Sequence, residues 1–290
     1  MGINWYPGHM DKAQKQLRKL VKEADIIIEV LDARIPYSSC NPLIAEISKE
    51  TIRLKVLNKA DIADPAVTAK WVNFFNKQRN IQAITTTGHH PKSAKIIINK
   101  IKSLVTKPNS IKPIKAVITG IPNSGKSTII NTLNNKKIAQ TGNEPAVTKQ
   151  QSRINLKNGI IVFDTPGILW PKIENPYSSY RLAATGAIKN TAFNLYDIII
   201  FVINYLMNNY NKELKQRYQL PKDINEEELI IEFIAKRTGA VIENQAQMDK
   251  NKLAETIIND LRKCKIGFIS LESPNSIQEE QLQLQEKNEN

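Results

Sequence analysis

The segment Gly120–Ser127, with the sequence GIPNSGKS, constrains the fold of this chain most strongly because it fits the pattern GxxxxGK[ST]. The apolar stretch Lys115–Thr119 precedes it, and the amphipathic stretch Ser127–Leu133 follows it. A strand, a glycine-containing turn and a helix in this order direct backbone N–H groups toward phosphate oxygens. We therefore predict a phosphate-binding loop at the carboxyl end of a buried strand.

The residue types of this loop indicate separate roles. Lys126 is expected to place its ammonium on the β- and γ-phosphate oxygens, where it also counts as catalytic, and the Ser127 hydroxyl is expected to ligate Mg²⁺. The residues of the loop expected to contact nucleotide are Asn123, Ser124, Gly125, Lys126, Ser127 and Thr128.

The sequence Asp164-Thr165-Pro166-Gly167 follows another apolar stretch, Ile160–Phe163, and begins 37 residues after Ser127. An aspartate at the end of a buried strand can hold Mg²⁺ through water, and a glycine N–H can meet the γ-phosphate and so sense its hydrolysis. We assign Asp164 to the metal and Gly167 to the nucleotide.

The sequence Asn58-Lys59-Ala60-Asp61 closes a third apolar stretch and indicates guanine recognition. The Asp61 carboxylate can accept hydrogen bonds from N1–H and the exocyclic amine of guanine, which adenine does not offer. Asn58 is expected to bind the base edge, and the Lys59 stem to cover the base face. Asn-Lys occurs six times in the chain, but only this copy is followed two residues later by Asp. A weaker base-contacting turn is predicted at Thr86 and Thr87.

Alternating strand and helix patterns favour a three-layer α/β/α domain of the P-loop class, with its sites at the carboxyl ends of the strands. From about residue 208 only helical patterns follow. We predict three parts: a GTPase-type domain over 1–205, a small all-helical domain over 206–274, and a polar tail over 275–290 that is disordered. The predicted strands are 24–31, 53–57, 82–85, 115–119 and 160–163, and the predicted helices of the first domain are 10–22, one from Pro65, 94–105 and 127–133.

The charge is uneven along the chain. The formal net charge is +13, and between Asp64 and Glu144 there are 13 basic residues and no acidic one. This asymmetry predicts a polyanionic partner. The two cysteines favour a reducing, cytoplasmic compartment, and the short apolar runs predict neither a signal peptide nor a membrane span. We expect a monomer without membrane or DNA partners.

The order of the motifs is unusual, because the guanine motif precedes the phosphate loop by about sixty residues. The order G4-G5-G1-G2-G3 indicates a circularly permuted GTPase domain. This order, the N-terminal Trp5–Met10 and the segment Asp32–Pro36 together resemble the ribosome biogenesis GTPase A family over residues 1 to about 272.

The resemblance implies a GTP-hydrolysing factor that binds the precursor of the large ribosomal subunit, through ribosomal RNA and ribosomal proteins, late in assembly. It implies that the GTP form binds and that hydrolysis releases it. It also implies that the ribosomal subunit stimulates hydrolysis and that the helical domain helps to dock on RNA. The cofactors implied are GTP or GDP with Mg²⁺, and K⁺.

Three residues take their roles from this resemblance. Thr148 occupies the position of the switch threonine that ligates Mg²⁺ in the GTP state. Ile168 stands where Ras-like proteins have a water-orienting glutamine, and the family assigns that catalytic role to the N-terminal histidine, here His9. Asn123 matches a P-loop asparagine associated with K⁺.

Several alternatives stay open on the sequence alone. His9 can be a packing residue, and Asp32 and Arg34 can either shape the sheet edge or contact RNA. The chain can be an RNA-binding assembly chaperone with little GTP hydrolysis. A GTPase acting on tRNA or at a membrane is disfavoured, since the chain has neither tRNA-modifying motifs nor long apolar segments.

Overall fold

A computed structural model describes residues 9–88, 90–106, 112–134, 152–156, 158–165, 167, 169–170, 173, 175–188, 194–242 and 247–289. The strands are β1 (Ile26–Asp32), β2 (Ile52–Asn58), β3 (Ile81–Thr85), β4 (Ile114–Gly120), β5 (Ser152–Asn155), β6 (Ile160–Asp164), β7 (Val241–Ile242) and β8 (Gln247–Met248). The helices are α1 (His9–Glu23), α2 (Pro42–Ile47), the 3-10 helix η1 (Ala60–Ile62), α3 (Pro65–Asn76), α4 (Pro91–Leu104), α5 (Lys126–Asn134), α6 (Pro176–Thr185), α7 (Leu195–Asn209), α8 (Asn211–Tyr218), α9 (Glu227–Arg237), α10 (Lys250–Arg262) and α11 (Pro274–Glu289).

Within the described residues, β1 to β6 form one sheet in the order β3-β2-β1-β4-β6-β5. All neighbouring pairs are parallel except β5 with β6. The five predicted strands are confirmed as β1, β2, β3, β4 and β6. The strand that precedes the glycine-containing loop, β4, lies at the centre of this sheet, although it is fourth in the chain. The strand that ends at Asp32 (β1) thus lies directly beside the strand that leads to the glycine-containing loop (β4), and the strand that ends in the guanine motif (β2) lies next beyond β1, although both precede β4 in the chain.

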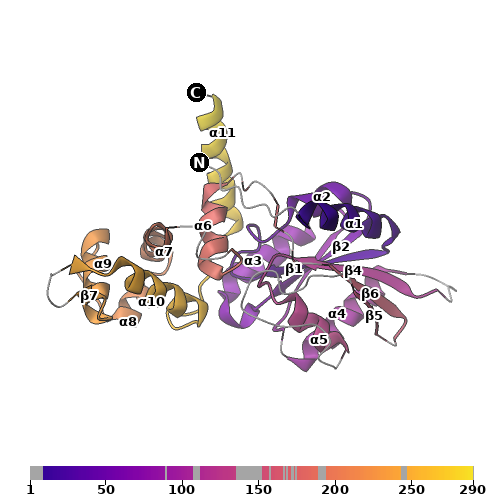
Figure 1. The fold of residues 1–290 in the computed structure, drawn as a ribbon, viewed down its shortest axis with the longest axis horizontal. Helices are drawn as coiled ribbons and strands as arrows, with labels where there is room; N and C mark the ends of the chain where they lie inside the picture. The colour runs from indigo at the N-terminus through magenta and orange to yellow at the C-terminus, as the bar shows by residue number, and fades with distance from the viewer. Residues whose placement is uncertain are drawn as a thin grey trace.

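Helices cover both faces of the sheet (Figure 1). The side chains of Ile26, Ile28 and Val30 in β1 share a core with Ile97 of α4 and Ile129 of α5. The alternate residues of β1 face the other way, where Ile27 packs with α1 and α2, and Leu31 packs with Trp71 and Phe75 of α3. Nearly continuous apolar sequence in β1 follows from this burial on both faces.

The second part of the molecule is helical apart from the short β7–β8 ladder, and it lies to one side of the sheet in Figure 1. One hydrophobic core joins α6, α7, α8, α9 and α10. Helix α7 runs from Leu195 to Asn209, so the domain boundary predicted between residues 205 and 206 falls inside a continuous helix. The helices α6 and α7 pack on α10, which places them with the helical part rather than with the sheet.

The predicted disorder of residues 275–290 is wrong for nearly all of that range, because Pro274–Glu289 forms helix α11. The segment is polar in composition, which suggested disorder, but its Ile277 is buried. This side chain is 4% exposed and joins the core beneath α3. No helix in the described ranges combines the length and the apolar character needed to cross a bilayer.

Candidate nucleotide-binding site

The parallel strands place the predicted motif residues at one edge of the sheet. β2, β4 and β6 end at Asn58, Gly120 and Asp164. β1 ends at Asp32, which is paired in register with Asn58, and Thr86 directly follows β3. Motifs that are up to about a hundred residues apart in the chain therefore meet at a single site.

Asn58 connects the guanine motif to the phosphate loop. Its amide Nδ2 donates to the backbone oxygen of Ser124 at 2.8 Å, and its Oδ1 accepts from Thr86 Oγ1 at 3.3 Å. The backbone N–H of Ala60 also donates to Thr86 O at 3.2 Å. The residue expected to bind the base edge thus fixes three loops relative to one another.

Two glycines permit this close approach. Gly125 has φ +90°, and a Cβ there would lie 2.2 Å from Asn58 Nδ2. At Gly120 a Cβ would lie 2.6 Å from the backbone oxygen of Val30. A side chain at either position would force the loop away from the strands. The loop therefore keeps the compact backbone cradle that suits phosphate oxygens.

Lys126 and Asp164 form a buried ion pair beneath the loop. Burial lowers the pKa of Lys126 from its usual value, while the charge of Asp164 opposes that shift. Burial likewise raises the pKa of Asp164, and Lys126 opposes it. Lys126 belongs to the first turn of α5, and Asp164 is the last residue of β6. Phosphate oxygens would meet the opposite charge of Lys126, and a divalent cation would meet that of Asp164.

Two further residues of the loop belong to the helix that follows it. Ser127 and Thr128 are half-buried in the first turn of α5. The buried Ser124 Oγ has no hydrogen-bond partner among the described residues. This donor, the glycine cradle and the Lys126–Asp164 pair fit a nucleotide phosphate with Mg²⁺, for which Ser127 and Asp164 supply oxygen donors.

The two charged side chains of the guanine motif, Lys59 and Asp61, differ in their surroundings. Lys59 has a left-handed backbone, with φ 62°, and its Nζ lies 2.9 Å from Asp32 Oδ2. Asp61 is exposed in η1, with the charge of Arg34 nearby. The arrangement leaves the Asp61 carboxylate accessible to a base, while Lys59 is held against the sheet.

Asp32 and Arg34, whose role the sequence left open, form a buried pair in the structure. Arg34 Nη2 lies 2.7 Å from Asp32 Oδ2. Burial alone would raise the pKa of Asp32, but the charges of Arg34 and Lys59 outweigh it and hold the pKa well below its usual value. The Asp32 carboxylate therefore stays ionised and supports Lys59.

The weaker base-contacting turn also belongs to the site edge. Thr86 is buried and Thr87 is half-buried, and an open pocket of about 180 Å³ beside them is lined also by Ala60 and His90. The Thr87 backbone oxygen accepts from Ser93 Oγ at 2.6 Å, and this bond fixes the turn on α4.

Asn123 makes a contact that the sequence did not predict. Its Nδ2 donates to the backbone oxygen of Gly186 at 2.6 Å, just after α6. Gly167 lies close on the other side of the loop, since a Cβ there would be 3.4 Å from Pro122 N. The phosphate loop is thus packed between the segment after β6 and the first helix of the helical domain.

Three predicted residues cannot be placed. Thr148 and Ile168 lie outside the described residues, and for His9 the structure describes the backbone at the start of α1 but not the side chain. Their roles stay predictions.

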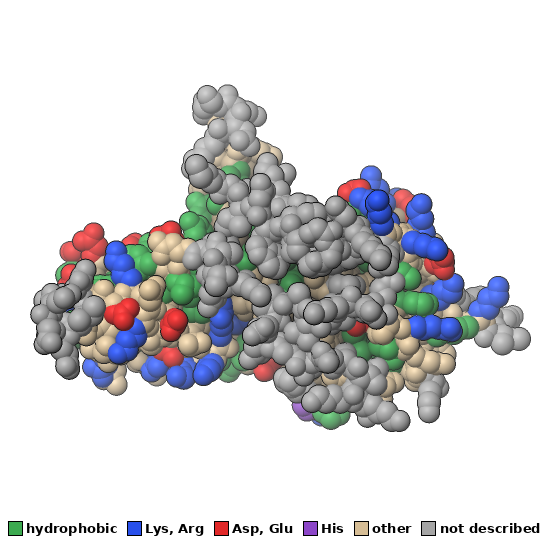
Figure 2. Space-filling view, viewed as in Figure 1, with side chains coloured by type: hydrophobic (Ala, Val, Ile, Leu, Met, Phe, Trp, Pro, Cys, Tyr) green, Lys and Arg blue, Asp and Glu red, His purple; other side chains and the backbone are tan. Residues whose placement is uncertain are grey.

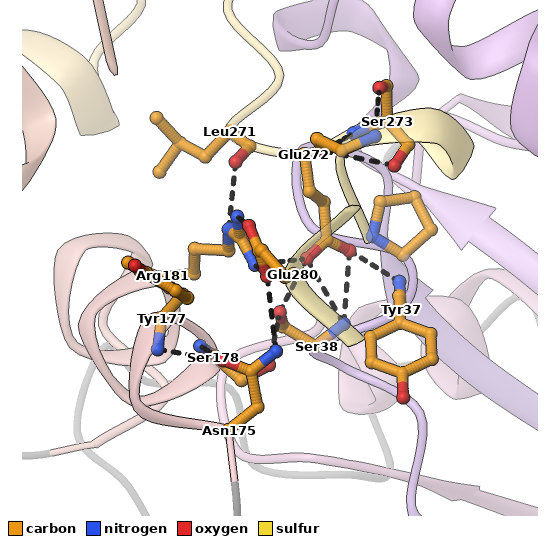
Figure 3. A network of polar contacts seen from close by, with 12 residues as sticks. Tyr37, Ser38, Asn175, Tyr177, Ser178, Arg181, Leu271, Glu272, Ser273 and Glu280 are labelled. Carbon is orange, nitrogen blue, oxygen red and sulfur yellow. Dashed lines mark hydrogen bonds and ion pairs between the residues drawn. The ribbon is translucent and has the colours of Figure 1, made fainter. Parts of the chain in front are cut away.

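A polar network that the sequence analysis did not predict joins α6 and α11 to the segment after β1 (Figure 3). The fully buried Glu272 accepts from the N–H and hydroxyl of Ser38, six residues after β1, and Trp71 Nε1 donates to its backbone oxygen at 3.1 Å. Arg181 of α6 donates to Leu271 O at 2.8 Å and pairs with Glu280 of α11. No sequence signal identifies this network, because its members come from four distant segments.

Comparisons with known proteins agree with this geometry. Residues 115–237 match the family described as "50S ribosome-binding GTPase". The chain is similar to Ribosome biogenesis GTPase A of Priestia megaterium, with 40% identity over 96% of this chain and 99% of that protein. It is also similar to Mitochondrial GTPase 1 of Schizosaccharomyces pombe, with 30% identity over 94% and 90% of the two chains. The crystal structure of GNP-bound YlqF from T. maritima superposes with a TM-score of 0.64 and 25% identity, covering 91% of this chain and 98% of that one.

Proposed function

The chain belongs to the ribosome biogenesis GTPase A family, and we propose that it acts late in assembly of the large ribosomal subunit, binding the precursor in its GTP form and leaving on hydrolysis. It is a GTPase of ribosome biogenesis with a circularly permuted P-loop domain. The ribosomal part of the proposal rests on the similarity to Ribosome biogenesis GTPase A. The single structural observation that carries its nucleotide-binding part is the hydrogen bond from Asn58 Nδ2 to the Ser124 backbone oxygen, which joins the guanine motif to the phosphate loop.

The roles proposed at the site follow from its geometry and charge. Asp61 recognises guanine, and the stem of Lys59 covers the base. Lys126 neutralises charge on the β- and γ-phosphates, and it exchanges part of its pairing with Asp164 for these oxygens. Mg²⁺, when bound to Ser127, Thr148 and Asp164, supplies further neutralisation of the phosphate charge.

We assign hydrolysis and its stimulation to groups from the N-terminal segment and from the loop. His9 begins α1, and it orients the attacking water in place of a glutamine. Asn123 supports a K⁺ ion through its amide oxygen, the side-chain atom that can coordinate a cation, while its Nδ2 donates to the backbone oxygen of Gly186. Contact with ribosomal RNA near α1 accelerates the reaction.

The surface around α1 suits such a partner. Lys15, Arg18, Lys19 and Lys22 are exposed on α1. Lys and Arg side chains gather along the edge of the domain that carries α1 (Figure 2). A basic surface of this kind binds phosphate backbones with strong salt dependence and little sequence preference.

Co-sedimentation with purified large subunits and their precursors tests the proposal. Binding is expected with a non-hydrolysable GTP analogue and not with GDP, and multiple-turnover hydrolysis should rise when the subunits are added. Equal binding in the two nucleotide states, or turnover that subunits leave unchanged, would contradict the proposal. In the same assay, His9→Ala should hydrolyse slowly on subunits while it still binds GTP.

A further inference from the structure

Arg262, the last residue of α10, binds the end of another helix. Its Nε donates to Ala184 O at 2.8 Å, and its Nη2 donates to Ala183 O at 2.7 Å. These carbonyls belong to the last turn of α6, where a cation also opposes the partial negative charge of the helix terminus. The planar guanidinium thereby fixes the carboxyl end of α6.

The end of α6 in turn contacts the phosphate loop. Gly186 caps α6 with φ +86°, and its carbonyl accepts the 2.6 Å hydrogen bond from Asn123 Nδ2. A Cβ on Gly186 would lie 3.3 Å from Arg262 Cζ, so the guanidinium packs directly on this cap. Arg262, Gly186 and Asn123 therefore form consecutive contacts from the helical domain to the phosphate loop.

The charge of Arg262 also acts on the guanine motif. Burial and the neighbouring charge of Arg34 lower its pKa to about 10, so it stays charged at neutral pH. Burial lowers the pKa of Lys59 too, with Arg34 and Arg262 among the charges that add to this shift. The charge of Arg262 thus reaches the guanine motif, while its hydrogen bonds fix the end of α6 that contacts the phosphate loop.

We infer that Arg262 is a positioning residue of the nucleotide site, through which the placement of the helical domain sets the conformation of the phosphate loop. Arg262 acts on Gly186, and Gly186 acts on Asn123. A partner that moves the helical domain would therefore change the retention of guanine nucleotide. This inference rests on the assignment of Gly120–Ser127 as the phosphate loop in the proposed function.

The test compares Arg262→Met with a matched control, Arg217→Met. Arg217 of α8 also belongs to the helical domain and makes a two-pronged contact, at 3.0 and 2.7 Å, with Asp260 of α10. Its described contacts stay within the helical domain. The readouts are the dissociation rate of a fluorescent GDP analogue from the full chain and the Tm.

Arg262→Met is expected to release the GDP analogue about tenfold faster, as for the loss of a charge-assisted hydrogen-bond pair. Arg217→Met is expected to lower the Tm while release stays within about twofold of wild type, since the loss of a contact within the domain leaves the loop unchanged. Equal release rates for the two variants would overturn the inference.

A double variant separates positioning from general destabilisation. If Arg262 acts through Asn123, Arg262→Met combined with Asn123→Ala should release the analogue no faster than Asn123→Ala alone. If the two substitutions instead multiply their effects on the release rate, Arg262 does not act through Asn123. Arg262→Lys keeps the charge but loses the two parallel donors of the guanidinium, so it should release the analogue about threefold faster than wild type. This variant replaces Arg262→Met in the test if the methionine variant does not fold. Release from this lysine variant at the wild-type rate would also count against the inference.

The wild-type measurement distinguishes the two proposals. If the unmodified chain does not bind the GDP analogue, the assignment of the loop fails. If it binds normally and Arg262→Met behaves like Arg217→Met, only the inference about Arg262 fails.

Discussion

At the scale of single residues, the four positions Asn58 to Asp61 have different partners although they are adjacent in the chain. Asn58 bonds to the phosphate loop, Lys59 pairs with Asp32, and Asp61 stays exposed. The left-handed backbone of Lys59 makes this divergence possible. The proposed recognition of the base therefore depends on the exposed carboxylate of Asp61, and this role can be tested directly.

Asp61→Asn should weaken GTP binding about 100-fold, because two hydrogen bonds to a carboxylate are lost. The amide should at the same time favour xanthine, whose carbonyl accepts where guanine donates. Hydrolysis of GTP and XTP by the wild type and the variant provides the measurement. Unchanged preference for GTP would exclude Asp61 from base recognition.

Glycine at position 125 is required by both conformation and space. Gly125→Ala should destabilise the protein by about 2–4 kcal/mol and abolish GDP binding, since a left-handed alanine also collides with Asn58. The matched control is Gly159→Ala, which has φ +83° but no atom within 4 Å of the added Cβ. The control should cost only about 1 kcal/mol and leave GDP binding intact. Urea unfolding and a GDP titration measure both effects.

The Asp32 carboxylate makes stability depend on pH with a defined sign. Its folded pKa lies well below the ordinary value of 3.8, so its contribution is complete above pH 3.8 and is lost as the pH falls toward the folded pKa. Asp32→Asn leaves two cations without their partner and should cost about 3 kcal/mol at pH 7. The difference from wild type in urea unfolding should shrink below pH 3.8. A difference that stays constant down to pH 2.5 would rule out this role of the charge.

At the scale of elements, the polar composition of α11 did not predict that this segment forms a helix packed on the rest of the molecule. Residues 275–290 have a net charge of −3 and few apolar side chains. The helix forms nevertheless, because Ile277 enters the core beneath α3 and Glu280 pairs with the buried Arg181. Both partners come from segments far away in the chain, and no local pattern reveals them.

Deletion of residues 274–290 should therefore destabilise the protein by about 2–4 kcal/mol, from the lost burial of Ile277 and the lost partner of Arg181. A control deletion of residues 285–290 removes only the end of the helix and should leave the unfolding midpoint unchanged. Chemical denaturation of the three chains is the measurement. Equal stability of the longer deletion and wild type would instead support a tail that does not dock.

At the scale of the whole molecule, the sheet separates charges that are contiguous in sequence. The acid-free stretch predicts a polyanionic partner. In the structure, exposed bases of this stretch lie both on α3, which covers one face of the sheet, and on α4, which covers the other. A single polyanion cannot lie flat on both faces, so the bases of these two helices do not form one binding surface. The exposed bases of α1 form a more compact candidate.

Charge reversal on α1 should weaken binding to the ribosomal subunit. Replacement of Lys15, Lys19 and Lys22 by glutamate is expected to reduce affinity at least about tenfold and to lower the slope of log affinity against log salt by about 2 to 3. The matched control reverses Lys92, Lys95 and Lys102 of α4, on the other face. Co-sedimentation across a salt series measures both. A larger loss for the α4 variant would move the interface to that face.

The sequence by itself determined five strands of the sheet and indicated the chemistry of the loops. Buried strands, a glycine-containing turn and short motifs are local patterns, and β1, β2, β3, β4 and β6 were all predicted from them. The permuted order of the motifs was also predicted from the sequence, because parallel strands bring their carboxyl ends together whatever their order in the chain. Residue roles at Asn58, Lys126 and Asp164 rest on the same local information.

The tertiary structure alone decided which distant groups meet. The Asn123–Gly186 bond, the contact of Arg262 with α6 and the burial of Glu272 each join segments separated by 60 residues or more. The helical domain begins earlier than composition suggested, since α6 and α7 bury their apolar faces on α10. Long-range packing leaves no periodic trace in a single sequence, and so the coupling of the two domains is visible only when the chain is folded.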